Sequence, residues 1–149
     1  MMSRWFLLVW LAIALVGCGA TSQPKLALPG VPASKARLVF YRDGNPYHGL
    51  AWTRVSLNGE RIGASAPGTV FYRDVAPGVY RIAVDSEKLY PDQVKAVMVD
   101  AGSTTFIKVV GLPFWGQSGV QWWGYTFTVA VIAPAIGQYE IGPLHLTSG

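Results

Sequence analysis

Cysteine is almost missing from this sequence, in which Cys18 is the single example. One thiol excludes a disulfide within the chain and any metal site built from several thiolates. Histidine occurs only twice, and a site made by His48 and His145 would need a carboxylate that folding brings close to them. We interpret both histidines as isolated surface residues and expect no metal ion and no other cofactor.

Charged residues are scarce as well, at 13% of the chain, and no segment concentrates them. Nucleic-acid-binding proteins usually gather lysine and arginine in a patch or along a helix. Here the arginines alternate singly with apolar residues, which is typical of solvated strand faces: Arg37, Arg42, Arg54, Arg61, Arg73 and Arg81. The composition therefore argues against a nucleic-acid partner.

Motifs for catalysis are also absent. The sequence contains no GxSxG nucleophile motif and neither of the glycine-rich phosphate-binding motifs. Glu60, Glu87 and Glu140 are scattered, so they suggest no pair of catalytic carboxylates. Residues 43–45 resemble only the start of a calcium loop and are better explained as a turn. We expect no catalytic residue; a hydrolase built on one of the two histidines and a nearby acid is the alternative.

The N-terminal segment has the layout of a secretory signal peptide. Arg4 precedes twelve apolar residues, 5–16, a run too short for a membrane-spanning helix, which needs about 20. Residues 15–18, Leu-Val-Gly-Cys, resemble the lipobox of bacterial lipoproteins. This resemblance implies cleavage before Cys18 and a covalent lipid on its sulfur. An ordinary signal peptide with a chance cysteine, or an uncleaved anchor, would be the alternatives.

The segment also predicts where the protein is located. Two or three fatty chains hold a protein stably on a membrane, whereas one chain does so only marginally. Gly19 stands where an aspartate would resemble the signal for retention in the inner membrane. We therefore expect a lipid-anchored protein of the bacterial outer membrane that faces the periplasm. The domain boundaries follow: residues 1–17 form the signal peptide, 18–34 a flexible Pro/Gly-rich linker, and 35–145 the folded domain.

Beyond residue 35 the pattern is that of an all-β domain. Short stretches rich in β-forming residues recur at intervals of eight to twelve residues and are separated by glycine and proline. The expected strands are 36–42, 52–57, 60–64, 69–75, 80–85, 93–100 and 104–110, and residues 125–133 and 137–142 supply one or two closing strands, with Pro134 as the break between them. In 80–85, Tyr80, Ile82 and Val84 alternate with polar residues, as in a half-buried strand. This pattern predicts a small antiparallel β-sandwich with almost no helix.

Three turns connect these strands in the expected fold. Asn58-Gly59 is the dipeptide that best fits a type I′ hairpin turn. Residues 76–79 place Pro and Gly at the centre of a type II turn. Residues 101–103, Ala-Gly-Ser, predict a further hairpin between 93–100 and 104–110.

These strands and turns, in this order, resemble the lipoprotein family called domain of unknown function 2846. The residues that match its pattern are Tyr41-Arg42, Asn58-Gly59 with Gly63, Phe71-Tyr72, the Pro77–Tyr80 turn, and Ala101-Gly102 with Phe106. The resemblance spans roughly residues 36–110, about half of the chain. It implies a prealbumin-like β-sandwich, close to the PEGA type, and it brings no catalytic residue.

Residues 111–127 have an unusual composition, rich in aromatic residues and glycine. Such a segment could stack on sugar rings, seat an apolar partner or lie at a membrane interface. Alternatively, Trp123, Tyr125 and Phe127 alternate into the core while the other aromatic residues cover its open end. The candidate contact residues are Phe114, Trp115 and Trp122.

We therefore expect a membrane-anchored periplasmic lipoprotein that serves as a non-catalytic interaction or structural module of the cell envelope. Its contact surface would be the aromatic segment and the loop at residues 43–52. The alternative is a module that binds a glycan, peptidoglycan or lipopolysaccharide, through its tryptophans. The partner would be an envelope protein or one of these glycans.

Overall fold

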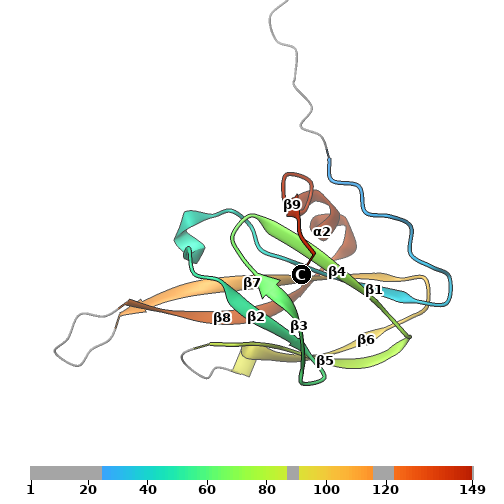
Figure 1. Cartoon of the computed structure of the whole chain (residues 1–149), viewed down its shortest axis with the longest axis horizontal. Helices are drawn as coiled ribbons and strands as arrows, with labels where there is room; N and C mark the ends of the chain where they lie inside the picture. The colour runs from blue at the N-terminus through green and yellow to red at the C-terminus, as the bar shows by residue number, and fades with distance from the viewer. Residues whose placement is uncertain (1–24, 87–90, 116–122, 149) are drawn as a thin grey trace, which may run out of the picture.

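Two β-sheets pack face to face in the computed structural model, which describes residues 25–86, 91–115 and 123–148 (Figure 1). One sheet contains, in spatial order, β8 (Trp123–Ile132), β7 (Thr104–Trp115), β1 (Ala36–Tyr41), β4 (Thr69–Val75) and β9 (His145–Leu146). The other contains β3 (Glu60–Ser65), β2 (Thr53–Leu57), β5 (Gly78–Val84) and β6 (Val94–Val99). Most neighbouring strands are antiparallel, whereas β1 pairs in parallel with β7, as β4 does with β9. The prediction of an all-β sandwich is confirmed.

The turn between β2 and β3 confirms the hairpin expected there. Asn58 and Gly59 have φ values of 52° and 87°, the left-handed region that a type I′ turn requires at both positions. The backbone N–H of Arg81 donates to the Asn58 side-chain oxygen at 2.8 Å, which fixes the turn against β5.

The prediction of a hairpin at residues 101–103 is wrong, although the strands before and after it, β6 and β7, are present. β6 and β7 lie in different sheets, so this turn carries the chain from one sheet to the other. The turn is held to the start of β1: the N–H of Gly102 donates to the carbonyl of Lys35 at 2.7 Å, and that of Arg37 to Ser103. The link at residues 76–77 likewise crosses between sheets. Glycine-containing turns fit such corners as well as they fit hairpins.

β1 is buried along its whole length, on both faces. Leu38 and Phe40 point into the core between the sheets, where the ring of Phe40 stacks on Phe71 with centroids 5.1 Å apart. Val39 and Tyr41 point the opposite way into a second cluster that includes Ile141. This strand is therefore the centre of a three-layer arrangement, two sheets and a partial outer cover.

The outer cover is made by α2 (Pro134–Glu140) and by the described start of the chain. The prediction of a strand at 137–142 is wrong, because a helix begins here at Pro134. Proline is favoured at the first position of a helix. Gly137 lets this helix approach β7 so closely that a Cβ atom would fall 2.3 Å from the ring of Phe106. Figure 1 shows α2 on the same side of the molecule as the described start of the chain.

The second part of the expected linker packs on the domain. The side chains of Leu26 and Leu28 contact the outer cluster, and the N–H of Leu26 donates to the carbonyl of Gly142 at 3.0 Å. Arg37, expected on a solvated face, is buried; its guanidinium binds Asp74 at 2.7 Å and the carbonyl of Pro29. Residues 26–30 are thus held against β1, which shortens the part of the chain that could act as a tether.

Candidate functional site

A loop at residues 43–52 joins β1 to β2 and contains one short helical turn, η1 (Pro46–His48). Asn45 begins this turn, because its side-chain oxygen accepts a hydrogen bond from the N–H of Tyr47 at 3.0 Å. Pro46 stands at the first helical position, where a missing N–H costs nothing. The local sequence therefore dictates the turn, but it does not dictate where the loop lies on the domain.

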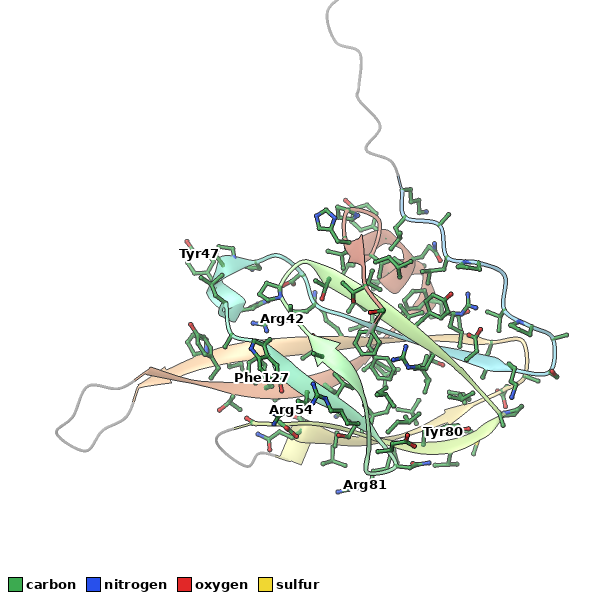
Figure 2. All side chains as sticks on the ribbon, viewed as in Figure 1. Arg42, Tyr47, Arg54, Tyr80, Arg81 and Phe127 are labelled. Atoms are coloured by element: carbon green, nitrogen blue, oxygen red, sulfur yellow. The ribbon has the colours of Figure 1, made fainter. Side chains whose placement is uncertain are left out.

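Arg42 determines that position. Strand alternation places its side chain on the same face as Leu38 and Phe40, so it enters the end of the core between the sheets. It is fully buried, and its guanidinium donates to the loop carbonyls of Gly49 and Ala51 at 2.5 Å each. It also donates to the carbonyl of His48. We call Arg42, whose side chain is labelled in Figure 2, and these three carbonyls the arginine clamp.

The prediction that Arg42 lies on a solvated face is wrong. Its burial lowers its pKa below the ordinary value, although an arginine remains protonated at neutral pH. The ring of Phe127 from β8 lies 5.1 Å from the guanidinium carbon and adds a cation–π contact. A buried cation needs such partners, and here the loop backbone supplies most of them.

Two glycines let the loop lie directly on β7 and β8. Gly49 has a φ of 79°, and a Cβ there would fall 2.1 Å from the ring of Tyr125. A Cβ at Gly111 would fall 2.2 Å from the carbonyl oxygen of His48. A side chain at either position would therefore displace the loop from the clamp.

The clamped loop exposes its large apolar side chains. Tyr47 is 83% exposed, Leu50 76% and Trp52 57%, and Leu112 of the adjoining strand β7 is also exposed. Figure 2 shows Tyr47 pointing away from the body of the molecule. We call Tyr47, Leu50 and Trp52 the apolar loop surface.

A cluster of polar residues connects the same loop to α2. The imidazole Nδ1 of His48 lies 2.8 Å from Asp43 Oδ1, and Lys108 Nζ lies 3.0 Å from the other oxygen of Asp43. Lys108 also donates to Glu140 at 2.9 Å, and Tyr41 donates to Glu140 at 2.5 Å. The interpretation of His48 as an isolated residue is therefore wrong.

Each ion in this cluster is stabilised by its neighbours. Burial alone would raise the pKa of Asp43, but hydrogen bonds from His48 and Lys108 outweigh it and hold the pKa below its ordinary value. The pKa of Glu140 is lowered in the same way, burial being outweighed by hydrogen bonds from Tyr41 and Lys108. Burial would lower the pKa of Lys108, yet the two carboxylates raise it overall. The pKa of Tyr41 is raised mainly by burial and further by its hydrogen bond to the Glu140 carboxylate.

The bonds of this cluster hold three parts of the fold together, and we call Asp43, Lys108 and Glu140 the brace. Its carboxylates already accept from a lysine and from a tyrosine or histidine, and they join the loop, β7 and α2. A hydrolase would also use a histidine beside a carboxylate. The close contact of His48 with Asp43 therefore meets the first geometric requirement of the hydrolase alternative. Among the described residues, no group of three or more His, Cys, Asp and Glu side chains could hold a metal ion.

The candidate residues predicted from the sequence lie at or beyond the limits of the described chain. Cys18 and Trp122 are outside the described residues. Phe114 and Trp115 end β7, where their backbones pair with Gly124 and Trp123; their side chains are outside the described part. Of the aromatic residues that could alternate into the core, Phe127 is buried and Tyr125 half-buried.

Sequence reasoning singled out the loop at 43–52, but it did not single out Tyr47, Leu50 or Trp52 within it. The signals available were Pro46 and Gly49, which mark a turn, and the apolar residues of the segment. Nothing local could show that a buried arginine holds the turn. Among the described helices, none is long and apolar enough to cross a membrane.

Comparison with known proteins identifies a family. A family model described as "Protein of unknown function (DUF2846)" matches residues 32–112, more than half of the chain. This match contains β1, the clamped loop and the four-stranded sheet, and it ends within β7. No curated protein and no solved structure matched the chain.

Replacing Arg42 by methionine removes the charged donors of the clamp and leaves buried carbonyls unpaired. We expect the free energy of unfolding to fall by on the order of 3 kcal/mol, measured by urea denaturation. Arg81→Met is the control, because that side chain is exposed and its loss changes stability by about 0.5 kcal/mol or less. Equal losses in the two variants would contradict the clamp.

Replacing Lys108 by methionine should change how stability depends on pH. The lowered pKa values of Asp43 and Glu140 mean that both carboxylates stabilise the fold above their ordinary values near pH 4 and lose this effect as the pH falls through their folded values. The raised pKa of Lys108 acts oppositely: its contribution is complete below about pH 10.4 and disappears as the pH rises through the folded value.

In Lys108→Met we therefore expect a loss on the order of 2 kcal/mol at pH 7 that shrinks below about pH 4, measured by urea denaturation over a pH series. Lys95→Met is the matched control, because Lys95 forms an exposed ion pair with Asp92. Its effect should stay below about 1 kcal/mol at every pH. A Lys108→Met loss that is the same at pH 3 and pH 7 would contradict the ion-pair account.

Proposed function

The chain belongs to the DUF2846 family of proteins of unknown function, and from this premise we propose that it is a lipid-anchored, non-catalytic interaction module of the bacterial cell envelope. The observation that carries the proposal is the apolar loop surface. A fully buried arginine fixes the loop, while Tyr47, Leu50 and Trp52 remain in solvent.

The lipid anchor is proposed from the sequence at Cys18. The lipobox-like residues 15–18 follow an apolar segment with the layout of a signal peptide. Acylation of Cys18 would attach the mature chain to the membrane, and Gly19 favours the outer membrane. The support for this part is sequence pattern alone.

The loop surface has the properties of a binding site for protein. Single exposed apolar residues are normal, but here three large ones lie within six residues of one loop. Tyrosine and tryptophan are enriched among the residues that contribute most to protein interfaces. Because the clamp already fixes the loop backbone, binding would order little further chain, and this lowers the entropic cost of association.

The chemistry of the surface indicates the kind of partner. Leu50 is aliphatic and lacks the aromatic face that stacks on a sugar ring, whereas it fits an apolar pocket or an apolar segment of another protein. The guanidinium of Arg54 lies 5.5 Å from the ring of Trp52 and also contacts Asp85 at 3.4 Å. We therefore propose an envelope protein with an exposed apolar segment as the partner. A glycan stacked on Trp52 and Tyr47 is the alternative.

Photo-crosslinking in cells tests this function. A photoreactive phenylalanine derivative replaces Leu50 in one variant and Met98 in the control, because Met98 is 73% exposed but lies on the other sheet. We expect a discrete protein adduct from position 50 only. Adding Trp52→Ser should reduce that adduct by about tenfold or more, in line with an interface residue worth roughly 2 kcal/mol.

Four results would count against the proposal. Adducts of the same size from positions 50 and 98, or an adduct unaffected by Trp52→Ser, would exclude the loop surface. Material retained on purified sacculi, and lost with Trp52→Ser, would support the glycan alternative instead. A membrane-bound native chain whose Cys18 carries no lipid by mass spectrometry would contradict the lipid anchor.

A further inference from the structure

A second exposed apolar surface lies on α2, apart from the loop. Tyr139 is 81% exposed and Ile136 55% exposed, and Pro143 follows the helix. A groove of about 300 Å³ is lined by Lys25, Tyr139 and Pro143 among others, so the described start of the chain adjoins this helix. We call Ile136, Tyr139, Pro143 and Lys25 the α2 face.

The α2 face carries no free negative charge. Glu140 is the one acidic residue between positions 133 and 146, and both of its oxygens are bound, one by Tyr41 and one by Lys108. The remaining charge on the face is the positive charge of Lys25. A partly apolar surface with a tyrosine and a lysine is suited to the boundary between lipid headgroups and acyl chains.

Chain length places this face near the proposed anchor. Seven residue steps separate Cys18 from Lys25. Even a fully extended chain of that length spans at most roughly 25 Å. Lys25 is itself fixed beside α2, because the next residue, Leu26, donates its N–H to the carbonyl of Gly142 at 3.0 Å. A lipid on Cys18 would therefore hold the bilayer within that distance of the α2 face.

We propose that the α2 face lies against the membrane that holds the acylated Cys18, an inference that rests on the proposed lipid anchor. Tyr139 lies at the level of the headgroups, Ile136 contacts the upper acyl chains, and Lys25 faces anionic headgroups. The lipid thus holds the domain in one orientation as well as at one location. The brace of Glu140, Lys108 and Asp43 then connects the membrane-facing helix to the clamped loop.

The single native cysteine makes a direct test possible. Because acylation occupies Cys18, a cysteine introduced at Tyr139 or Ile136 is the one thiol that a fluorescent label can modify. Met98→Cys is the matched control, since Met98 is 73% exposed on the other sheet. The full acylated chain is reconstituted in vesicles of phosphatidylethanolamine and phosphatidylglycerol, and quenching of each label by aqueous iodide is measured. The reference for each label is the same mature chain, begun at position 18 and carrying Cys18→Ser, free in solution.

We expect vesicle binding to reduce quenching several-fold at positions 139 and 136 and to leave position 98 unchanged. Equal quenching at all three positions, in chains that float with the vesicles, would overturn the orientation but not the anchor. Chains that do not float, and whose Cys18 carries no lipid by mass spectrometry, would overturn the anchor and the orientation that depends on it.

Discussion

Burying a guanidinium costs free energy that acceptors for its N–H groups must offset, and this constraint organises β1 and what surrounds it. Arg42 points into the core between the sheets and binds carbonyls of the loop at 43–52. Arg37 points to the opposite face and binds Asp74 and a carbonyl of the N-terminal segment. Arg37 in β1 and Arg42 just after it thus fix two irregular segments, one on each side, through charged donors.

The constraint also explains how exposed apolar side chains can belong to a fixed loop. Loops that present apolar groups normally either fold them inward or remain mobile, since exposed apolar area gives no stability. Here the stability of the loop comes from its backbone: three of its carbonyls bind Arg42, Gly49 lies against Tyr125, and Gly111 of β7 leaves room for the His48 carbonyl. The side chains of Tyr47 and Leu50 are therefore available for a partner without loss of order. The proposed membrane contact at α2 leaves this loop free.

Local turn chemistry made the fold class and most strands predictable, as Asn58-Gly59 illustrates. The partners of the strands were less predictable, because residues 101–103 turn a corner between sheets as readily as they close a hairpin. The unbroken run of apolar and aromatic residues at 38–41 was the available sign that both faces of β1 are covered. The burial of Arg42 was not foreseeable from the sequence, because its acceptors lie on a loop whose position Arg42 itself creates. For the same reason, the sequence did not reveal the apolar loop surface.

Amide hydrogen exchange in the loop tests the central claim, that Arg42 holds the loop in place, most directly. The N–H groups of His48 and Gly49 donate to the carbonyls of Asn45 and Pro46, so their exchange reports opening of the turn. In Arg42→Lys, which lacks the fork of donors, the account predicts exchange at these amides at least about tenfold faster than in the native chain, with β1 still protected. Unchanged exchange at both amides would contradict it.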